Sequence, residues 1–160
     1  MMSIDEQIRV MADQWPGFKL VNRVDRAARW EGKLAPDKRP HLVRVDYRVP
    51  LVIEKFDIHD VQPLVTVLNP VLEQHPDYEQ GPIPHVYWRR KEPDFPYLCL
   101  FSPSLGEWSL SDPLARTTIY WANEWLYFYE GWLITKKWKG GGRHLPGSDA
   151  GGKQHDRETV

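Results

Sequence analysis

The sequence predicts an α+β fold in one domain, with a helix before an antiparallel sheet and helical structure after it. The 160 residues amount to one domain's worth of chain, and 41% of them are apolar, which is enough for a hydrophobic core. At the start of the chain, apolar residues recur with the spacing of a helix. In the segment that follows, apolar and polar residues alternate as in a strand. A second and longer helical pattern begins near residue 112.

The first element is a helix that begins after Ser3. Glu6 stands three residues after this possible N-cap, the spacing of a capping box, and Pro16-Gly17 ends the pattern. One helical face carries the apolar residues Ile4, Ile8, Met11, Ala12 and Trp15.

A four-stranded antiparallel meander is predicted next. Apolar and polar residues alternate over 28–34 and again over 41–49, as in strands with one buried face. Residues 64–68 form a shorter apolar run between two prolines, and residues 97–101 form another. Residues 51–60 show no clear pattern and receive no assignment.

The segment 70–96 is rich in Pro, with Asp, Glu and His between the prolines. Loops of this length inside a compact domain usually have a function, so we expect a functional surface loop. It leads directly into the run that contains Cys99, the one cysteine of the chain.

A long helix is predicted over 112–137, with Ser111 or Asp112 as its cap. Its apolar arc is wider than a helix lying on a core requires, and it divides into two stripes. We expect the first to face the sheet: Ala115, Ile119, Ala122, Leu126, Tyr129 and Leu133. The second is Leu114, Trp121, Trp125, Phe128 and Trp132. It is covered either by the N-terminal helix or the segment around Trp138, or else by a protein partner.

Composition excludes several classes of protein. The 21 Lys and Arg against 22 Asp and Glu argue against a nucleic-acid binder, which normally carries a basic excess. No apolar stretch is long enough to span a membrane, and the N-terminus lacks the features of a signal peptide. We therefore expect a cytoplasmic domain over residues 1–145, followed by a flexible tail at 146–160 that is polar and contains glycine.

Cys99 is the first candidate for chemistry. A lone cysteine between leucines is commonly a small buried hydrophobe, but this one lies between two irregular segments, where partly exposed reactive thiols are found. His85 and His144 are its candidate polar helpers. No histidine pair has metal-ligand spacing and one cysteine cannot build a multi-cysteine site, so neither a metal nor a cofactor is predicted. A cysteine hydrolase is disfavoured because no Asn or Asp is obviously placed to orient a histidine.

The order of motifs resembles that of ubiquitin-conjugating enzymes, and in particular of their bacterial relatives in cyclic-oligonucleotide anti-phage signalling operons. The resemblance covers about residues 1–145 and implies the ubiquitin-conjugating fold. The residues that carry it are Pro84-His85-Val86-Tyr87, Leu98-Cys99-Leu100-Phe101, Glu107-Trp108, Glu124-Trp125-Leu126, Tyr129-Glu130-Gly131-Trp132 and Trp138 through Gly140-Gly141-Gly142-Arg143-His144.

The resemblance implies that Cys99 forms a thioester with the C-terminus of a protein cargo, a cyclic-oligonucleotide synthase of the same operon. The resemblance also implies that a separate enzyme would consume ATP to activate the C-terminus of the cargo. The family's eukaryotic members carry a His-Pro-Asn triplet shortly before the cysteine, whereas here His75-Pro76 lies far upstream and is followed by Asp77. An ionised Asp only accepts hydrogen bonds, so His85 is the nearer candidate for supporting an oxyanion. The alternative is a non-catalytic module of this fold that grips the synthase through its Trp-rich helix.

Overall fold

The computed structural model describes residues 1–52 and 55–141; His144 and the predicted tail at 146–160 lie outside them. The helices are α1 (Ile4–Gln14), α2 (Ile58–Val61) and α3 (Thr118–Thr135), with short 3-10 helices η1 (Pro103–Leu105) and η2 (Leu114–Arg116). The strands are β1 (Lys19–Val24), β2 (Ala27–Leu34), β3 (His41–Arg48), β4 (Leu64–Asn69), β5 (Val86–Tyr87) and β6 (Tyr97–Leu98). The predicted α+β class is confirmed.

The first helix begins where its capping box predicts. The Ser3 hydroxyl accepts a hydrogen bond from the Glu6 amide at 3.3 Å, and the Glu6 carboxylate accepts one from the Ser3 amide at 2.8 Å. The side chain of Gln7 then joins α1 to the segment before α3, because it accepts from the Leu114 amide and donates to the Asp112 carbonyl. This buried amide thereby satisfies backbone groups of a segment more than a hundred residues away in the chain.

Within the described residues the antiparallel sheet has six strands, in the order β1-β2-β3-β4-β6-β5, so the predicted count of four is wrong. The prediction did not place β1, because all six of its residues are exposed and the strand shows no alternation of buried and exposed positions. Strands β5 and β6 have two residues each, too few to form a period. The run at 97–101 is therefore a strand only over its first two residues.

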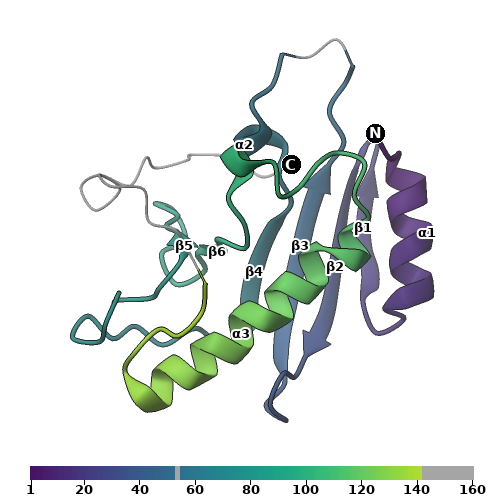
Figure 1. The fold of residues 1–160 in the computed structure, drawn as a ribbon. Coiled ribbons are helices and arrows are strands. Elements are labelled where there is room, and N and C mark those ends of the chain that lie inside the picture. The colour runs from purple at the N-terminus through teal and green to yellow at the C-terminus, as the bar shows by residue number, and fades with distance from the viewer. Residues whose placement is uncertain (53–54, 142–160) are drawn as a thin grey trace.

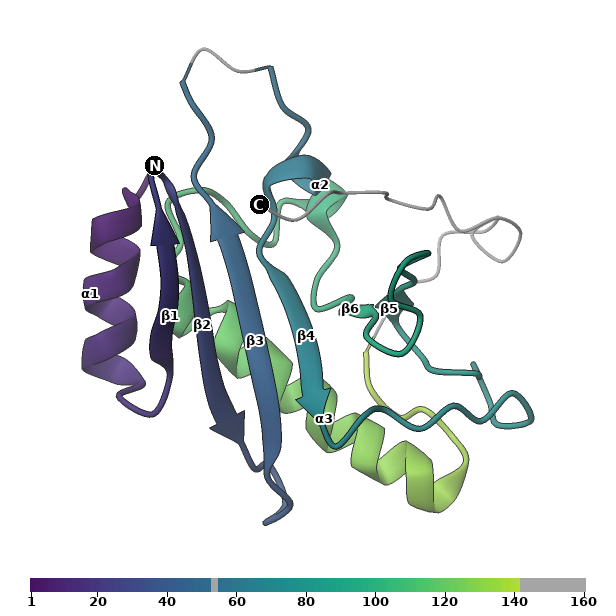
Figure 2. The ribbon, with the colours of Figure 1, turned by 180° about the vertical axis from the view of Figure 1, so that it is seen from behind.

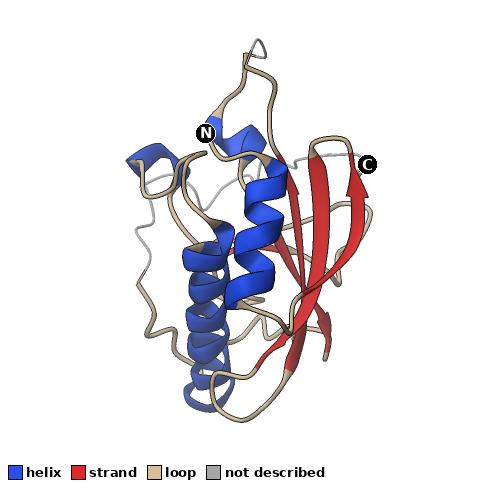
Figure 3. Cartoon of the chain, turned by 90° about the vertical axis from the view of Figure 1, so that its right-hand side faces the viewer, coloured by secondary structure: helices blue, strands red, loops and turns tan. Residues whose placement is uncertain are grey.

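The hydrophobic core lies between the sheet and the helices. Figure 1 shows α3 crossing the sheet diagonally and α1 near the β1 edge, Figure 3 shows both helices on the same side of the sheet, and Figure 2 shows the strands from the opposite side. The sheet contributes Trp30, Val43, Val45 and Val65, and α3 contributes Ile119, Ala122 and Leu126. Each large apolar side chain buried in this way stabilises the fold by roughly 1.5–3 kcal/mol.

The helix predicted over 112–137 begins six residues later than expected, at Thr118. The backbone of Thr117 has φ −123° and ψ −75°, outside the helical region, and it separates α3 from η2. The helix ends at Lys136, which adopts a left-handed conformation with φ 61°.

The second stripe of α3 is largely buried by this chain itself. Trp125 stacks on Tyr129 and contacts Trp138, and Trp132 is fully buried. The expectation that the segment around Trp138 covers the stripe is confirmed, and the alternative of a partner-docking face is wrong for both of these tryptophans. Trp121 and Phe128 are half-buried, in contact with Phe101 and Trp138 respectively.

The Pro-rich loop at 70–96 is the second cover of this stripe, and α3 fixes it through three polar side-chain atoms. The Tyr129 hydroxyl accepts from the Glu73 amide at 2.8 Å. The Trp132 indole donates to the Glu79 carbonyl at 2.7 Å, and the Trp125 indole donates to the His85 carbonyl at 3.1 Å. The loop is also folded tightly on itself at Gly81, where any side chain would collide with the carbonyl oxygen of His75. The loop is thus held by the aromatic residues of α3.

Candidate functional site around Cys99

Cys99 follows directly after β6 and is half-buried. Its backbone amide donates to the carbonyl oxygen of His85 at 2.9 Å, which extends the pairing of β5 with β6 by one residue. Its Sγ atom lies 3.9 Å from the carbonyl oxygen of Phe101. The backbone at Cys99 is therefore held by strand pairing, and the thiol also contacts the segment that follows it.

The hydroxyl of Tyr87 lies 3.3 Å from the Sγ atom of Cys99. The register explains this contact. Tyr87 pairs with Tyr97, so Cys99 is its diagonal neighbour on the same face, within reach of a long side chain. The side chain of Gln62, which follows α2, also hydrogen-bonds the Tyr87 hydroxyl and donates to the His59 carbonyl at 3.2 Å. Segments from three parts of the chain thus meet at the Tyr87 hydroxyl.

Burial is the main influence on the ionisation of this thiol. Desolvation raises the pKa of Cys99 above its ordinary value; the Tyr87 hydrogen bond opposes this shift, and the negative charge of Glu107 adds to it. The carboxylate of Glu107 is held nearby, because it accepts a hydrogen bond from the Ser102 amide at 2.7 Å. The resting thiol is therefore mostly protonated at neutral pH.

Burial, together with the charge and hydrogen bond of Cys99, also raises the pKa of Tyr87, while the hydrogen bond from Gln62 opposes the rise. The phenol therefore keeps its proton at neutral and mildly alkaline pH. When Cys99 ionises, the Tyr87 hydroxyl is available as a hydrogen-bond donor to it.

His85 meets Cys99 through its backbone. Its carbonyl oxygen accepts from both the Cys99 amide and the Trp125 indole, and its φ of 49° places it in the left-handed region, which is uncommon for residues other than glycine. Its imidazole ring lies 5.2 Å from the Trp138 ring, centroid to centroid. The structure thus brings His85 and Cys99 together on adjacent segments, with the histidine ring packed on the C-terminal tryptophan.

The other residues singled out in the sequence lie elsewhere. His75 stacks on Tyr78 and lies 3.1 Å from a carboxylate oxygen of Glu73, so it belongs to the loop that covers α3. Trp108 is 2% exposed and packs against Tyr47 and Phe101, which makes it a core residue. Sequence reasoning did not single out Tyr87 as a site residue. The motif Pro84–Tyr87 was noted, but only the register of β5 and β6 shows that its tyrosine contacts the thiol.

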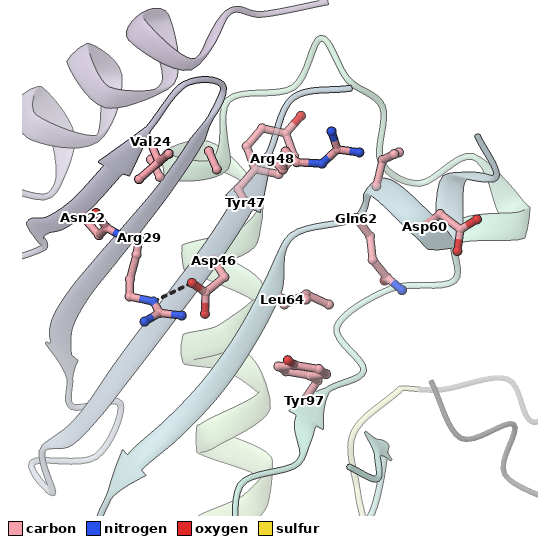
Figure 4. A pocket seen from close by; sticks show the side chains of 13 residues that line it. Asn22, Val24, Arg29, Asp46, Tyr47, Arg48, Asp60, Gln62, Leu64 and Tyr97 are labelled. Atoms are coloured by element: carbon pink, nitrogen blue, oxygen red, sulfur yellow. Dashed lines mark hydrogen bonds and ion pairs between the residues drawn. The ribbon is translucent and has the colours of Figure 1, made fainter. Parts of the chain in front are cut away.

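A pocket of about 150 Å³ opens elsewhere, on the face of the sheet opposite α3 (Figure 4). The ion pair of Arg29 with Asp46, 2.6 Å between the closest atoms, lies at its wall, and Gln62 and Tyr97 also line it. Of the candidate residues that the structure describes, neither Cys99 nor His85 lines this pocket. Gln62 is shared between the pocket and the Cys99 site, since its side chain also interacts with Tyr87.

Two further features concern the class of protein. Among residues 1–52 and 55–141, no group of three or more His, Cys, Asp or Glu side chains is arranged to hold a metal ion. Within the same residues, none of the helices has both the length and the apolar character that crossing a membrane requires.

The chain was compared with known protein families. The family described as "Type II CBASS E2 protein" matches residues 7–145. The chain belongs to this family. A search of curated proteins found no match. Membership confirms the resemblance to conjugating-enzyme-like proteins of bacterial antiviral defence, and the matched range contains Cys99, Tyr87, His85 and His144.

Proposed function

We propose that this E2-like protein forms a thioester between Cys99 and the C-terminus of a protein cargo, a cyclic-oligonucleotide synthase of the same defence system. The observation that carries the proposal is the position of the chain's one cysteine. Cys99 is half-buried, its backbone amide is paired with His85, and it lies in a chain that the E2 family matches over residues 7–145. Family membership supports the E2-like role, and the chemistry of a thiol supports the thioester.

The step is an exchange of one thioester for another. The cargo arrives as a thioester, its C-terminus having been activated by a separate enzyme that consumes ATP. The Cys99 thiol loses its proton to solvent, and Sγ bonds to the cargo's terminal carbonyl carbon. The bond from that carbon to the sulfur of the activating enzyme breaks, and the thiolate released on that enzyme takes up a proton. The protein needs only to hold Sγ accessible and to orient the cargo's tail.

Two histidines belong to the same proposal as polar helpers, His85 beside Cys99 and His144 in the Gly-rich segment. His85 is supported by its hydrogen bond to the Cys99 amide, which places it on the neighbouring segment. His144 lies outside the described residues and rests on its place in the family motif.

The test is the intact mass of the protein after incubation with the cargo and its activating enzyme. We expect an adduct that is removed by excess thiol and is not formed by Cys99→Ala. Cys99→Ser is the matched variant, because an ester at Ser would survive the thiol that cleaves a thioester. An unchanged, thiol-sensitive adduct on Cys99→Ala would show that Cys99 is not the attachment site.

A second candidate function is a non-catalytic module that binds the synthase. The raised pKa of Cys99 favours it, because a protonated thiol is a poor nucleophile. Alkylation of the folded protein by iodoacetamide separates the two functions. Reaction within minutes at pH 8 supports the transferase, whereas reaction that requires unfolding supports the binding module.

A further inference from the structure

We propose that Tyr87 is a catalytic residue of this site, whose hydroxyl donates a hydrogen bond to the sulfur of Cys99 and stabilises the thiolate that attacks the cargo. This inference rests on the thioester function proposed above and names the group that prepares the nucleophile. It assigns a catalytic role to a tyrosine of β5, whereas the candidate helpers predicted from the sequence are the histidines His85 and His144.

The geometry is specific to this tyrosine. Its hydroxyl lies 3.3 Å from Sγ, and both residues belong to the paired segments β5 and β6, so the contact is set by backbone hydrogen bonds. The Gln62 side chain also interacts with this hydroxyl, and it donates to the His59 carbonyl at 3.2 Å. In the resting state the thiol donates to this hydroxyl oxygen, so once Cys99 ionises the hydroxyl needs only to turn its proton toward the sulfur that it already contacts.

The neighbouring groups leave the hydroxyl as the favourable contact for a thiolate. Glu107 acts on the sulfur with a negative charge, which opposes ionisation. The Phe101 carbonyl oxygen, 3.9 Å from Sγ, can only accept hydrogen bonds. The His85 carbonyl is engaged by the Cys99 amide and the Trp125 indole. Tyr87 therefore supplies the hydrogen bond that counters burial and the carboxylate.

The variant that tests this role is Tyr87→Phe in the full chain, since it removes a single oxygen atom and keeps the ring. Tyr97→Phe is the matched control, because it removes a hydroxyl from the facing strand and leaves the contact between Tyr87 and Cys99 in place. Both variants are first compared with wild type by thermal unfolding, and near-equal midpoints show that the fold is kept.

The readout is the rate of Cys99 alkylation by iodoacetamide as a function of pH, with the ultraviolet absorbance of the thiolate as a second measurement. We expect the midpoint of Tyr87→Phe to rise by about one pH unit, a roughly tenfold smaller thiolate fraction at neutral pH, with Tyr97→Phe unchanged. A midpoint of Tyr87→Phe that equals the wild-type value, or falls below it, overturns the role of Tyr87.

This experiment needs no cargo, so its result is independent of the thioester itself. Absence of any adduct on the wild-type protein would overturn the proposed transfer function and leave the alkylation result standing. Where the wild type does form the adduct, Tyr87→Phe should form it about tenfold more slowly at neutral pH. Formation at the wild-type rate would overturn the catalytic role.

Discussion

The indole of Trp125 and the backbone amide of Cys99 donate to the same atom, the carbonyl oxygen of His85, at 3.1 Å and 2.9 Å. Through this oxygen a residue in the middle of α3 fixes the segment that faces the candidate nucleophile. The tryptophans of α3 are therefore part of the support of the site, and they act through backbone groups of the covering loop.

Replacement of Trp125 by Phe tests this support. The variant removes the indole N–H and some buried volume, so we expect a loss of about 1–3 kcal/mol in the free energy of unfolding and faster alkylation of a loosened Cys99. Urea unfolding and iodoacetamide kinetics measure the two effects. Trp88→Phe is the control, because Trp88 is 36% exposed and should tolerate the change. Equal losses in both variants would argue against a supporting role for the indole.

Two tryptophans of the same stripe should respond very differently to truncation. Trp132 is fully buried and donates to the Glu79 carbonyl, so Trp132→Ala should cost about 3–5 kcal/mol of stability. Trp121 is half-buried, and Trp121→Ala should cost less than half as much. Chemical denaturation of both variants makes the comparison. A larger loss from Trp121→Ala would contradict the packing described here.

The thiol should also make stability depend on pH. Because burial raises the pKa of Cys99 in the folded protein, the unfolded chain loses this proton first as pH increases. The thiol's contribution is therefore complete below pH of about 8.5 and is lost as pH rises from there toward the folded pKa. We expect the free energy of unfolding of wild type relative to Cys99→Ala to fall between pH 8 and pH 10. A constant difference across this range would show that the thiol ionises equally in both states.

Removing the charge of Glu107 should shift the pKa of Cys99 in the opposite direction from removing the Tyr87 hydroxyl. Its charge raises the pKa of Cys99, so Glu107→Gln should lower the midpoint of the alkylation profile by a few tenths of a pH unit, while the amide oxygen can still accept from the Ser102 amide. The shift should shrink as salt is added, because Glu107 is exposed. A midpoint that moves upward would contradict the electrostatic explanation.

The large elements could be predicted from the sequence because their side chains repeat over several turns or strand residues. The capping box of Ser3 and Glu6 marks where α1 begins. The alternation over β2 and β3 and the apolar stripe of α3 indicate which side of each element faces the core. Strand β1 was not predicted because the residues on both of its faces are exposed, so its sequence does not alternate. Backbone pairing with β2 makes it a strand.

The surroundings of Cys99 were only partly predictable. The sequence predicts the thiol inside a short apolar run directly after a long loop, and the structure has Cys99 next to the two-residue strand β6. The family resemblance was confirmed. The contact with Tyr87 depends on the register of two strands of two residues each, and such strands leave no pattern in a sequence. For the same reason, the histidine beside the cysteine could be named from the sequence, but the role of its carbonyl oxygen could not.

Strand β6 pairs with β4 through a single residue pair, Thr66 with Tyr97, whereas β2 and β3 pair along their whole length. Strands β2 and β3 are thus joined by a continuous series of backbone pairs, whereas the segment around β5 and β6 is held mainly by side-chain hydrogen bonds from α3 to the loop before it. Backbone amides of β2 and β3 should exchange with deuterium only when the whole domain unfolds. Those around Cys99 should exchange through a local opening that has a lower free energy than global unfolding. An entering polypeptide tail would then need to displace only a few hydrogen bonds to reach the sulfur, and the rest of the domain would stay folded as it did so.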